Sequence, residues 1–246
     1  MRPVGIVRFA PTEGPAWFAS WLTAAAIPWK EIRLDQGEPL PADTSTLSGL
    51  GLMGGPMSVN DPLPWVPPLL ALIRDADQRG APVIGHCLGG QLISRAFGGH
   101  VGINMVDGAP AKEIGWHTVT PVDTEQARDW FGTRLDFDVF QWHGETFSTP
   151  PGAIHLAASA RCANQAFAIG PHLGMQFHCE MDEATIATWC QSGADEVAEA
   201  LAGPHPEGVQ DAATVMHATP ERLPCMRAIS RRIYERWAAG LRRERQ

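Results

Sequence analysis

One cysteine in the sequence has the surroundings of a catalytic nucleophile. Cys87 lies in residues 85–91 (GHCLGGQ), after the apolar run 82–84 and before a helical pattern. A nucleophile on a tight strand-to-helix turn has a strained backbone, and small residues two positions before and after it prevent collisions. Gly85 and Gly89 meet this requirement. The sulfur would lie at a helix N-terminus, where the helix dipole favours the thiolate.

A nucleophilic thiol needs a base, and the base needs a group that orients it. His178 is followed two positions later by Glu180. In an extended segment these side chains point the same way, so Glu180 could hold one ring nitrogen and leave the other facing the thiol. The pair follows the apolar run 173–177, and active sites of parallel sheets gather at such strand ends. The alternative is a pair of surface or metal-ligand side chains.

The elements that must position these residues alternate in the first hundred residues. Apolar runs predict strands at 4–9, 31–34, 47–53 and 82–85. Helical patterns occupy 17–26, 65–78 and 88–97. Alternation of this kind predicts an α/β fold, with an open, mostly parallel sheet and helices on both faces.

The alternation of predicted strands and helices ends after residue 100. Short β-like pieces predict added antiparallel strands at 117–122, 138–142, 154–158, 165–169 and 173–177. After residue 182 the chain is expected to be helical, with breaks near 204–208, at Pro220 and at Pro224. One apolar helix face is predicted near the C-terminus, formed by Met226, Ile229, Ile233, Trp237 and Leu241.

Composition excludes several classes of function. The net charge of −8 over 246 residues argues against general nucleic-acid binding. No apolar run reaches the length of a membrane span, and residues 11–14 (PTEG) interrupt the N-terminus before any signal-peptide core. We therefore expect a cytoplasmic protein that binds no membrane. The five cysteines include no C-x-x-C pair, which disfavours a disulfide framework or a structural metal site.

Taken together, these motifs resemble the class I glutamine amidotransferases, which use a Cys-His-Glu triad. Residues 85–91 match the pattern Gly-x-Cys-x-Gly-x-Gln, and residues 53–58 match Met-Gly-Gly-Pro-x-Ser. Residues 177–180 match Phe-His-Pro-Glu, except that Cys179 replaces the usual proline. The resemblance covers residues 4–182. Four stretches favour the stand-alone, GMP-synthase-like group: 13–15, 53–61, 113–116 and 141–147.

The resemblance implies a flavodoxin-like domain at residues 1–183 and a helical extension at 184–246 packed on it. It implies that Cys87 attacks the side-chain amide of glutamine, that His178 transfers protons and that Glu180 orients His178. A thioester would form and then be hydrolysed by water.

The same resemblance assigns residues around this triad. The backbone N–H groups of Gly55 and Leu88 would form the oxyanion hole, which stabilises the tetrahedral intermediate. The implied substrate-binding residues are Gln91, Trp142, His143 and Gly144. His143 could equally be a structural side chain.

The implied products are glutamate and ammonia, the latter for an unidentified acceptor or a synthetase partner. One alternative is a γ-glutamyl peptidase or hydrolase, which cleaves γ-glutamyl amides or glutathione conjugates. Another is a non-catalytic regulatory or binding protein on the same fold. No cofactor is expected: residues 49–54 spell G-x-G-x-x-G but run into Pro56 rather than a helix, and no phosphate-binding P-loop motif occurs.

Cys179 is the departure from the family pattern. Proline would stiffen the chain between His178 and Glu180, whereas cysteine relaxes it. Cysteine also adds a second thiol to this motif. A disulfide between Cys87 and Cys179 under oxidation is therefore a hypothesis.

Overall fold

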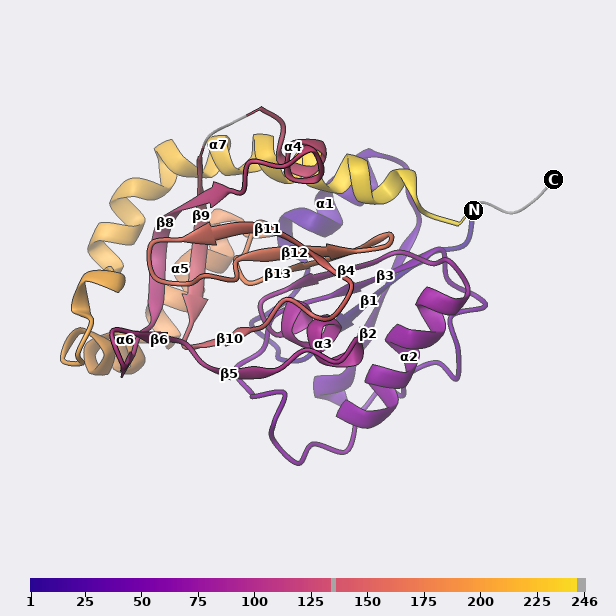
Figure 1. Cartoon of the computed structure of the whole chain (residues 1–246), viewed down its shortest axis with the longest axis horizontal. Helices are drawn as coiled ribbons and strands as arrows, with labels where there is room; N and C mark the ends of the chain where they lie inside the picture. The colour runs from indigo at the N-terminus through magenta and orange to yellow at the C-terminus, as the bar shows by residue number, and fades with distance from the viewer. Residues whose placement is uncertain (134–135, 243–246) are drawn as a thin grey trace.

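A nine-stranded sheet runs through the middle of the protein (Figure 1). The computed structural model describes residues 1–133 and 136–242. Five neighbouring strands are parallel, in the spatial order β2 (Trp29–Arg33), β1 (Val4–Arg8), β3 (Gly49–Leu52), β4 (Val83–His86) and β13 (His172–Met175). Four antiparallel strands continue the sheet: β12 (Ala166–Ile169), β11 (Ile154–Ser159), β8 (Glu113–Pro121) and β9 (Phe137–His143). This arrangement confirms the predicted fold class, but the strand predicted at 173–177 as an antiparallel addition is β13, which pairs parallel with β4.

Helices cover both faces of the sheet (Figure 1). One face carries α2 (Val66–Gln78) and α3 (Leu88–Ala96), and the other carries α1 (Ala16–Ala24) and α7 (Ala212–Ala239). Near α7 lie α4 (Glu125–Phe131) and α5 (Glu183–Ser192), and α6 (Ala194–Leu201) follows α5. Two short 3-10 helices occupy Leu34–Gln36 and Pro206–Gly208.

Small elements missing from the sequence prediction lie outside the main sheet. Strand β5 (Val101–Ile103) pairs with β10 (Glu145–Phe147), and β6 (Met105–Val106) pairs with β7 (Ala109–Pro110). The helix α4 is also additional; its N-cap Thr124 accepts a hydrogen bond from the Ala127 N–H.

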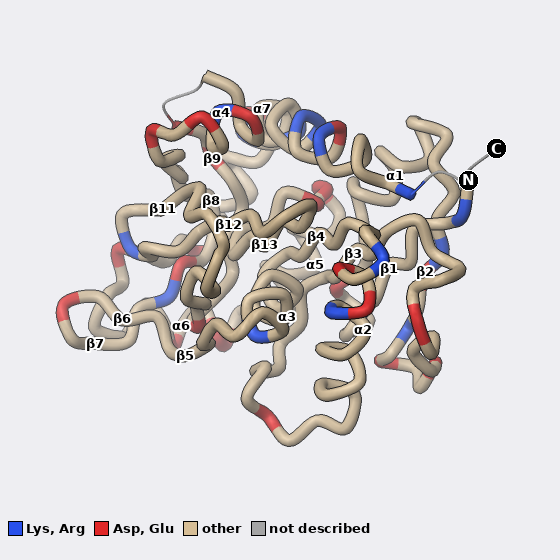
Figure 2. Tube along the Cα trace, turned by 45° about the vertical axis from the view of Figure 1, so that its right-hand side comes forward, with Lys and Arg blue, Asp and Glu red and all other residues tan. Residues whose placement is uncertain are grey.

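The two faces have separate apolar clusters because successive strand residues point in opposite directions. Ile6 of β1 packs in the cluster that contains Phe18 and Trp237, whereas its neighbour Val7 packs in the cluster of α2 and α3. The strands β3, β4, β12 and β13 contain no Asp, Glu, Lys or Arg, so Figure 2 shows them entirely in tan. Strands buried on both faces favour such apolar sequences.

The prediction that Pro220 and Pro224 break the last helix is wrong. Both lie inside the 28-residue helix α7, on its exposed side. Each proline removes one helical hydrogen bond, but water can reach the carbonyl groups that lose their donor. The buried opposite face outweighs this loss, and four of its predicted members are at most 3% exposed: Met226, Ile229, Ile233 and Trp237. The fifth predicted member, Leu241, is buried too but lies beyond the end of α7 at Ala239. The expected break near 204–208 is confirmed, since α6 ends at Leu201.

None of the helices in the two described ranges is long and apolar enough to cross a membrane.

The close approach of α3 to the sheet gives a stability prediction. A Cβ at Gly89 would lie 2.3 Å from the Leu52 carbonyl oxygen, and backbone atoms cannot rotate away. Gly89→Ala should therefore lower the free energy of unfolding by about 2–4 kcal/mol, measured by urea titration. This loss is expected even though alanine favours a helix more than glycine does. The control is Gly102→Ala, where nothing lies within 4 Å of the added carbon. Equal stability of the two variants would contradict the prediction.

Candidate active site

Cys87 lies on the sharp turn that joins β4 to α3. Its φ is 50° and its ψ is −109°, a region that side-chain-bearing residues rarely adopt. The turn is tight enough that a Cβ at Gly85 would lie 2.3 Å from the Gly89 carbonyl carbon. Donation from the Cys87 N–H to the Met175 carbonyl, at 2.9 Å, fixes the turn to β13. The predicted strained turn, with small residues on both sides, is present.

His178 and Glu180 lie just beyond the end of β13. The His178 N–H donates to the Phe140 carbonyl of β9 at 2.9 Å, which anchors the segment. The Nδ1 atom of His178 is 2.6 Å from Oε1 of Glu180, and both side chains are buried. Trp189 packs edge-on against the His178 ring at a centroid distance of 4.8 Å. In the described part of the chain, Nε2 of His178 has no hydrogen-bond partner.

The electrostatics of this pair favour a charged imidazole next to a carboxylate. Burial by itself lowers the pKa of His178, but the Glu180 charge and the neighbouring Cys87 thiol raise this pKa well above its ordinary value. Burial by itself raises the pKa of Glu180, but the charges of His86 and His178 lower it. The sequence-predicted residues Cys87, His178 and Glu180 are thus brought together.

A cavity of about 830 Å³ opens in front of Cys87 and His178. Gly55 lines it, and a Cβ at this position would lie 2.6 Å from Cδ2 of Leu88, so the two residues adjoin. Leu88 is the first residue of α3, and its N–H has no acceptor one turn earlier in the helix. Both predicted oxyanion residues therefore lie beside the Cys87 turn.

The predicted substrate-binding residues line the same cavity. Gln91 donates to Oε1 of Gln176 at 3.3 Å and to the Glu145 carbonyl at 3.4 Å. The Cys87 sulfur is 3.9 Å from the Trp142 carbonyl oxygen. Gly144 lies against the Lys112 side chain.

His143 is fixed at both ring nitrogens. Its Nε2 is 3.0 Å from Oε2 of Glu113, and its Nδ1 is 3.0 Å from the Glu145 carbonyl oxygen. The hydroxyl of Ser159 and the side-chain amide of Gln165 also donate to Glu113, each at 2.7 Å. Because these bonds occupy both ring nitrogens, His143 is suited to holding the loop 142–145 rather than to contacting a ligand through its ring.

Glu113, His143 and Cys162 also form a group whose ligand atoms lie within 4.8 Å of one another. Burial raises the pKa of the Cys162 thiol to about 11, which disfavours the thiolate that a metal needs. Both carboxylate oxygens of Glu113 already accept hydrogen bonds. We therefore interpret this group as a buried hydrogen-bonded network.

The helix α7 reaches the second layer of the site. The Ser230 hydroxyl lies 2.7 Å from the Cys179 carbonyl oxygen and 2.8 Å from the Met226 carbonyl oxygen. The Tyr234 hydroxyl is 3.3 Å from Nε2 of His86, and this nitrogen is 3.8 Å from Oε2 of Glu180. The segment that carries His178 and Glu180 is thus supported from the far side of the sheet.

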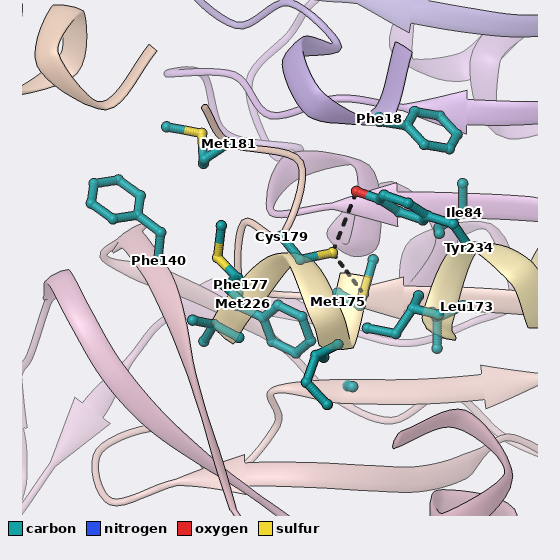
Figure 3. Close-up of a cluster of buried hydrophobic side chains, with 14 of the residues drawn as sticks. Phe18, Ile84, Phe140, Leu173, Met175, Phe177, Cys179, Met181, Met226 and Tyr234 are labelled. Carbon is teal, nitrogen blue, oxygen red and sulfur yellow. Dashed lines mark hydrogen bonds between the residues drawn. The ribbon is translucent and has the colours of Figure 1, made fainter. Parts of the chain in front are cut away.

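Cys179 points away from the cavity. Its thiol lies 3.5 Å from the Tyr234 hydroxyl and 4.0 Å from the Met175 sulfur, among the apolar side chains drawn in Figure 3. The alternation that directs His178 towards the cavity, with Glu180 beside its ring, directs Cys179 to the opposite side. The geometry gives no support to the hypothesis of a disulfide with Cys87, and both cysteines are free thiols.

Sequence reasoning did not assign several side chains of the cavity wall. Glu13, Lys112, Glu145 and Glu196 line it. Glu196 accepts from Nζ of Lys112 at 2.6 Å and from the Trp142 indole at 2.9 Å. Glu13, Lys112 and Glu145 lie within or next to the stretches that favour the GMP-synthase-like group, and these stretches were the sequence signal that could have identified them. No sequence motif pointed to Glu196, because it lies on α6, outside residues 4–182, and only tertiary packing brings it to the cavity.

Comparison with known proteins extends the geometric evidence. A family model described as "Glutamine amidotransferase class-I" matches residues 26–188. A solved glutamine amidotransferase structure from Methylobacillus flagellatus is 43% identical, with a TM-score of 0.94; the alignment covers 100% of this chain and 98% of that one.

Two curated relatives are more distant. The glutamine-hydrolysing GMP synthase of Thermomicrobium roseum is 34% identical over 161 residues, covering 61% of this chain and 27% of that protein. Gamma-glutamyl peptidase 3 of Arabidopsis thaliana is 28% identical over 150 residues, covering 58% and 59% respectively. The chain thus spans about a quarter of the first relative and about three-fifths of the second.

Proposed function

Because the chain belongs to the class I glutamine amidotransferases, we propose that it hydrolyses the side-chain amide of glutamine to glutamate and ammonia. The observation that carries the proposal is the arrangement of two side chains at one cavity. Glu180 holds Nδ1 of His178, Nε2 has no hydrogen-bond partner among the described residues, and Cys87 lies on a strained turn beside the ring.

The first half of the proposed reaction forms a thioester. The Cys87 sulfur attacks the γ-carbonyl carbon after its proton passes to Nε2 of His178, while Glu180 holds Nδ1. The N–H groups of Gly55 and Leu88 stabilise the negative oxygen of the tetrahedral intermediate. When the C–N bond breaks, His178 returns the proton to the nitrogen, and ammonia leaves.

The second half of the reaction restores the enzyme. His178 takes a proton from water, and the hydroxide attacks the thioester carbon. The C–S bond breaks, and glutamate leaves while Cys87 regains its proton.

Recognition of the amino-acid end of glutamine falls to the far side of the cavity. The partly buried Glu145 side chain is 3.1 Å from the Ser58 hydroxyl and offers a negative charge for an α-ammonium group. Gln91 and the backbone of Trp142 and Gly144 would contact the remaining polar atoms.

The fate of the ammonia is also part of the proposal. The likeness to GMP synthases favours a synthetase acceptor in general terms. The chain would then act as the ammonia-supplying subunit of such a partner.

A γ-glutamyl peptidase is the second candidate function. The cavity of about 830 Å³ continues past Gly144 to α6 and residues 203–205, which is more space than free glutamine needs. A peptide or conjugate attached to the γ-carbonyl would fit there, and the same thioester chemistry would release it. The similarity to a plant γ-glutamyl peptidase supports this reading.

Substrate profiling separates these functions. The protein is incubated with L-glutamine, with γ-glutamyl dipeptides and with L-asparagine, which is one methylene shorter and serves as the control. Ammonia release from glutamine and a γ-glutamyl adduct on Cys87 by intact mass support the amidohydrolase. Cleavage of dipeptides, with glutamine inert, supports the peptidase. Inertness to both, with biological activity retained in Cys87→Ala, supports a non-catalytic role.

A further inference from the structure

Glu13 is a cavity carboxyl group that the proposed reaction does not yet use. It lies in the loop between β1 and α1, within the motif of residues 13–15. The loop is tied on both sides of Glu13 to the elements around His178. The Trp189 indole donates to the Thr12 carbonyl at 2.8 Å, and the Trp17 N–H donates to the Glu180 carbonyl at 2.7 Å. The carboxyl group is therefore held in a defined place.

That place is beside Gly54, next to the oxyanion residue Gly55. A Cβ added to Gly54 would lie 2.3 Å from Oε2 of Glu13 and 2.8 Å from Cε1 of His178. The absence of a side chain at Gly54 therefore lets the carboxyl group and the imidazole approach each other. Both also line the cavity that contains the Cys87 sulfur.

The Glu13 carboxyl group is available to a ligand. The carboxyl group is buried near other charged groups, and no residue in the described ranges forms a hydrogen bond with it. Burial raises the pKa of Glu13 to about 7; the neighbouring His178 lowers this pKa, and Glu180 and Glu196 raise it. A substantial ionised fraction is therefore present near neutral pH.

The position relative to His178 indicates which part of a substrate Glu13 faces. The carbonyl oxygen of a bound γ-amide would point to the N–H groups of Gly55 and Leu88. Its nitrogen would point to His178, which must give it a proton. A carboxylate next to that imidazole lies on the side of the departing nitrogen.

We propose that the Glu13 carboxylate accepts a hydrogen bond from the leaving nitrogen of the amide and is a further catalytic residue. This inference rests on the proposed thioester chemistry. The Cδ–N bond of the side-chain amide breaks as His178 protonates the nitrogen, and the electron pair of that bond stays on the nitrogen. Glu13 only accepts an N–H hydrogen bond during this step, so it neither gains nor loses a proton. Its interaction strengthens as positive charge develops on the nitrogen, which lowers the barrier.

The test compares two leaving groups in one variant. The leaving group of L-glutamine is a nitrogen that carries N–H donors. The leaving group of L-glutamate γ-methyl ester is a methoxy oxygen that carries no such donor. In Glu13→Gln we expect kcat/KM for glutamine to fall by about tenfold or more. For the ester we expect a change within about twofold, and this activity also shows that the variant is folded. The control is Glu199→Gln, an exposed carboxylate on the outer cavity wall, which should change neither value.

Two results would overturn the inference. Equal losses on the amide and the ester would assign Glu13 a structural role, and an unchanged kcat/KM for glutamine would remove it from the reaction. A parent protein inert towards both compounds would instead overturn the proposed function, and this inference with it.

Discussion

Exchange of Cys87 for serine should reduce glutamine hydrolysis by about 10⁴-fold or more. The serine side chain fits the same turn, so the strained backbone and the surrounding glycines remain. Its hydroxyl is a much weaker acid than a thiol, and His178 cannot generate a comparable nucleophile from it. The measurement is ammonia release at saturating glutamine, together with the γ-glutamyl adduct detected by mass.

The matched control for this prediction is Cys225→Ser, since Cys225 is an exposed free thiol on α7. It should retain the parent rate. A Cys87→Ser variant that is folded and within tenfold of the parent would contradict a thioester route.

The second large effect is expected at Glu180. Glu180→Gln keeps the size of the side chain but removes the charge that lies 2.6 Å from Nδ1 of His178. We expect kcat/KM to fall by roughly 10²- to 10⁴-fold, as for the buried carboxylates of other triads. Because the Glu180 charge raises the pKa of His178 and burial lowers it, this pKa should fall in the variant. The limb of the pH profile that reports loss of the His178 proton should move to lower pH.

Glu113→Gln serves as the control, because Glu113 forms another buried pair with a histidine, His143. It should leave that limb in place, whatever its effect on stability. A parental pH profile and rate in Glu180→Gln would remove Glu180 from the reaction.

The chemistry of the site could be predicted from sequence where it depends on neighbours in the chain. The turn at Cys87 needs small residues at fixed offsets, and Gly85 and Gly89 lie at those offsets. The pair His178 and Glu180 needs only an extended backbone between its members. Such local rules act on a few consecutive residues, so single-sequence reasoning captures them.

The cavity wall could not be predicted in the same way. Glu196 reaches it from α6, and Glu13 reaches it from the loop after β1, because tertiary packing brings these segments together. No spacing rule links positions so far apart in the sequence.

Two features of the fold show the same limit. The strands β5, β6, β7 and β10 contain two or three residues each, too few for a recognisable alternation. In α7 the local rule for proline gave the wrong answer, since Pro220 and Pro224 face solvent while the opposite side of the helix is buried. The free energy of that burial is invisible to a rule about one residue.

The contact between Ser230 and the Cys179 carbonyl has an evolutionary consequence. A proline at position 179 would restrict the backbone through its own ring. In this chain the hydroxyl of Ser230, about fifty positions away, restrains the same peptide instead. The two positions should therefore covary among homologues that retain the last helix. Homologues with proline at position 179 would be free to lose the serine at position 230. Homologues with another residue at position 179 should keep a hydrogen-bonding side chain at position 230.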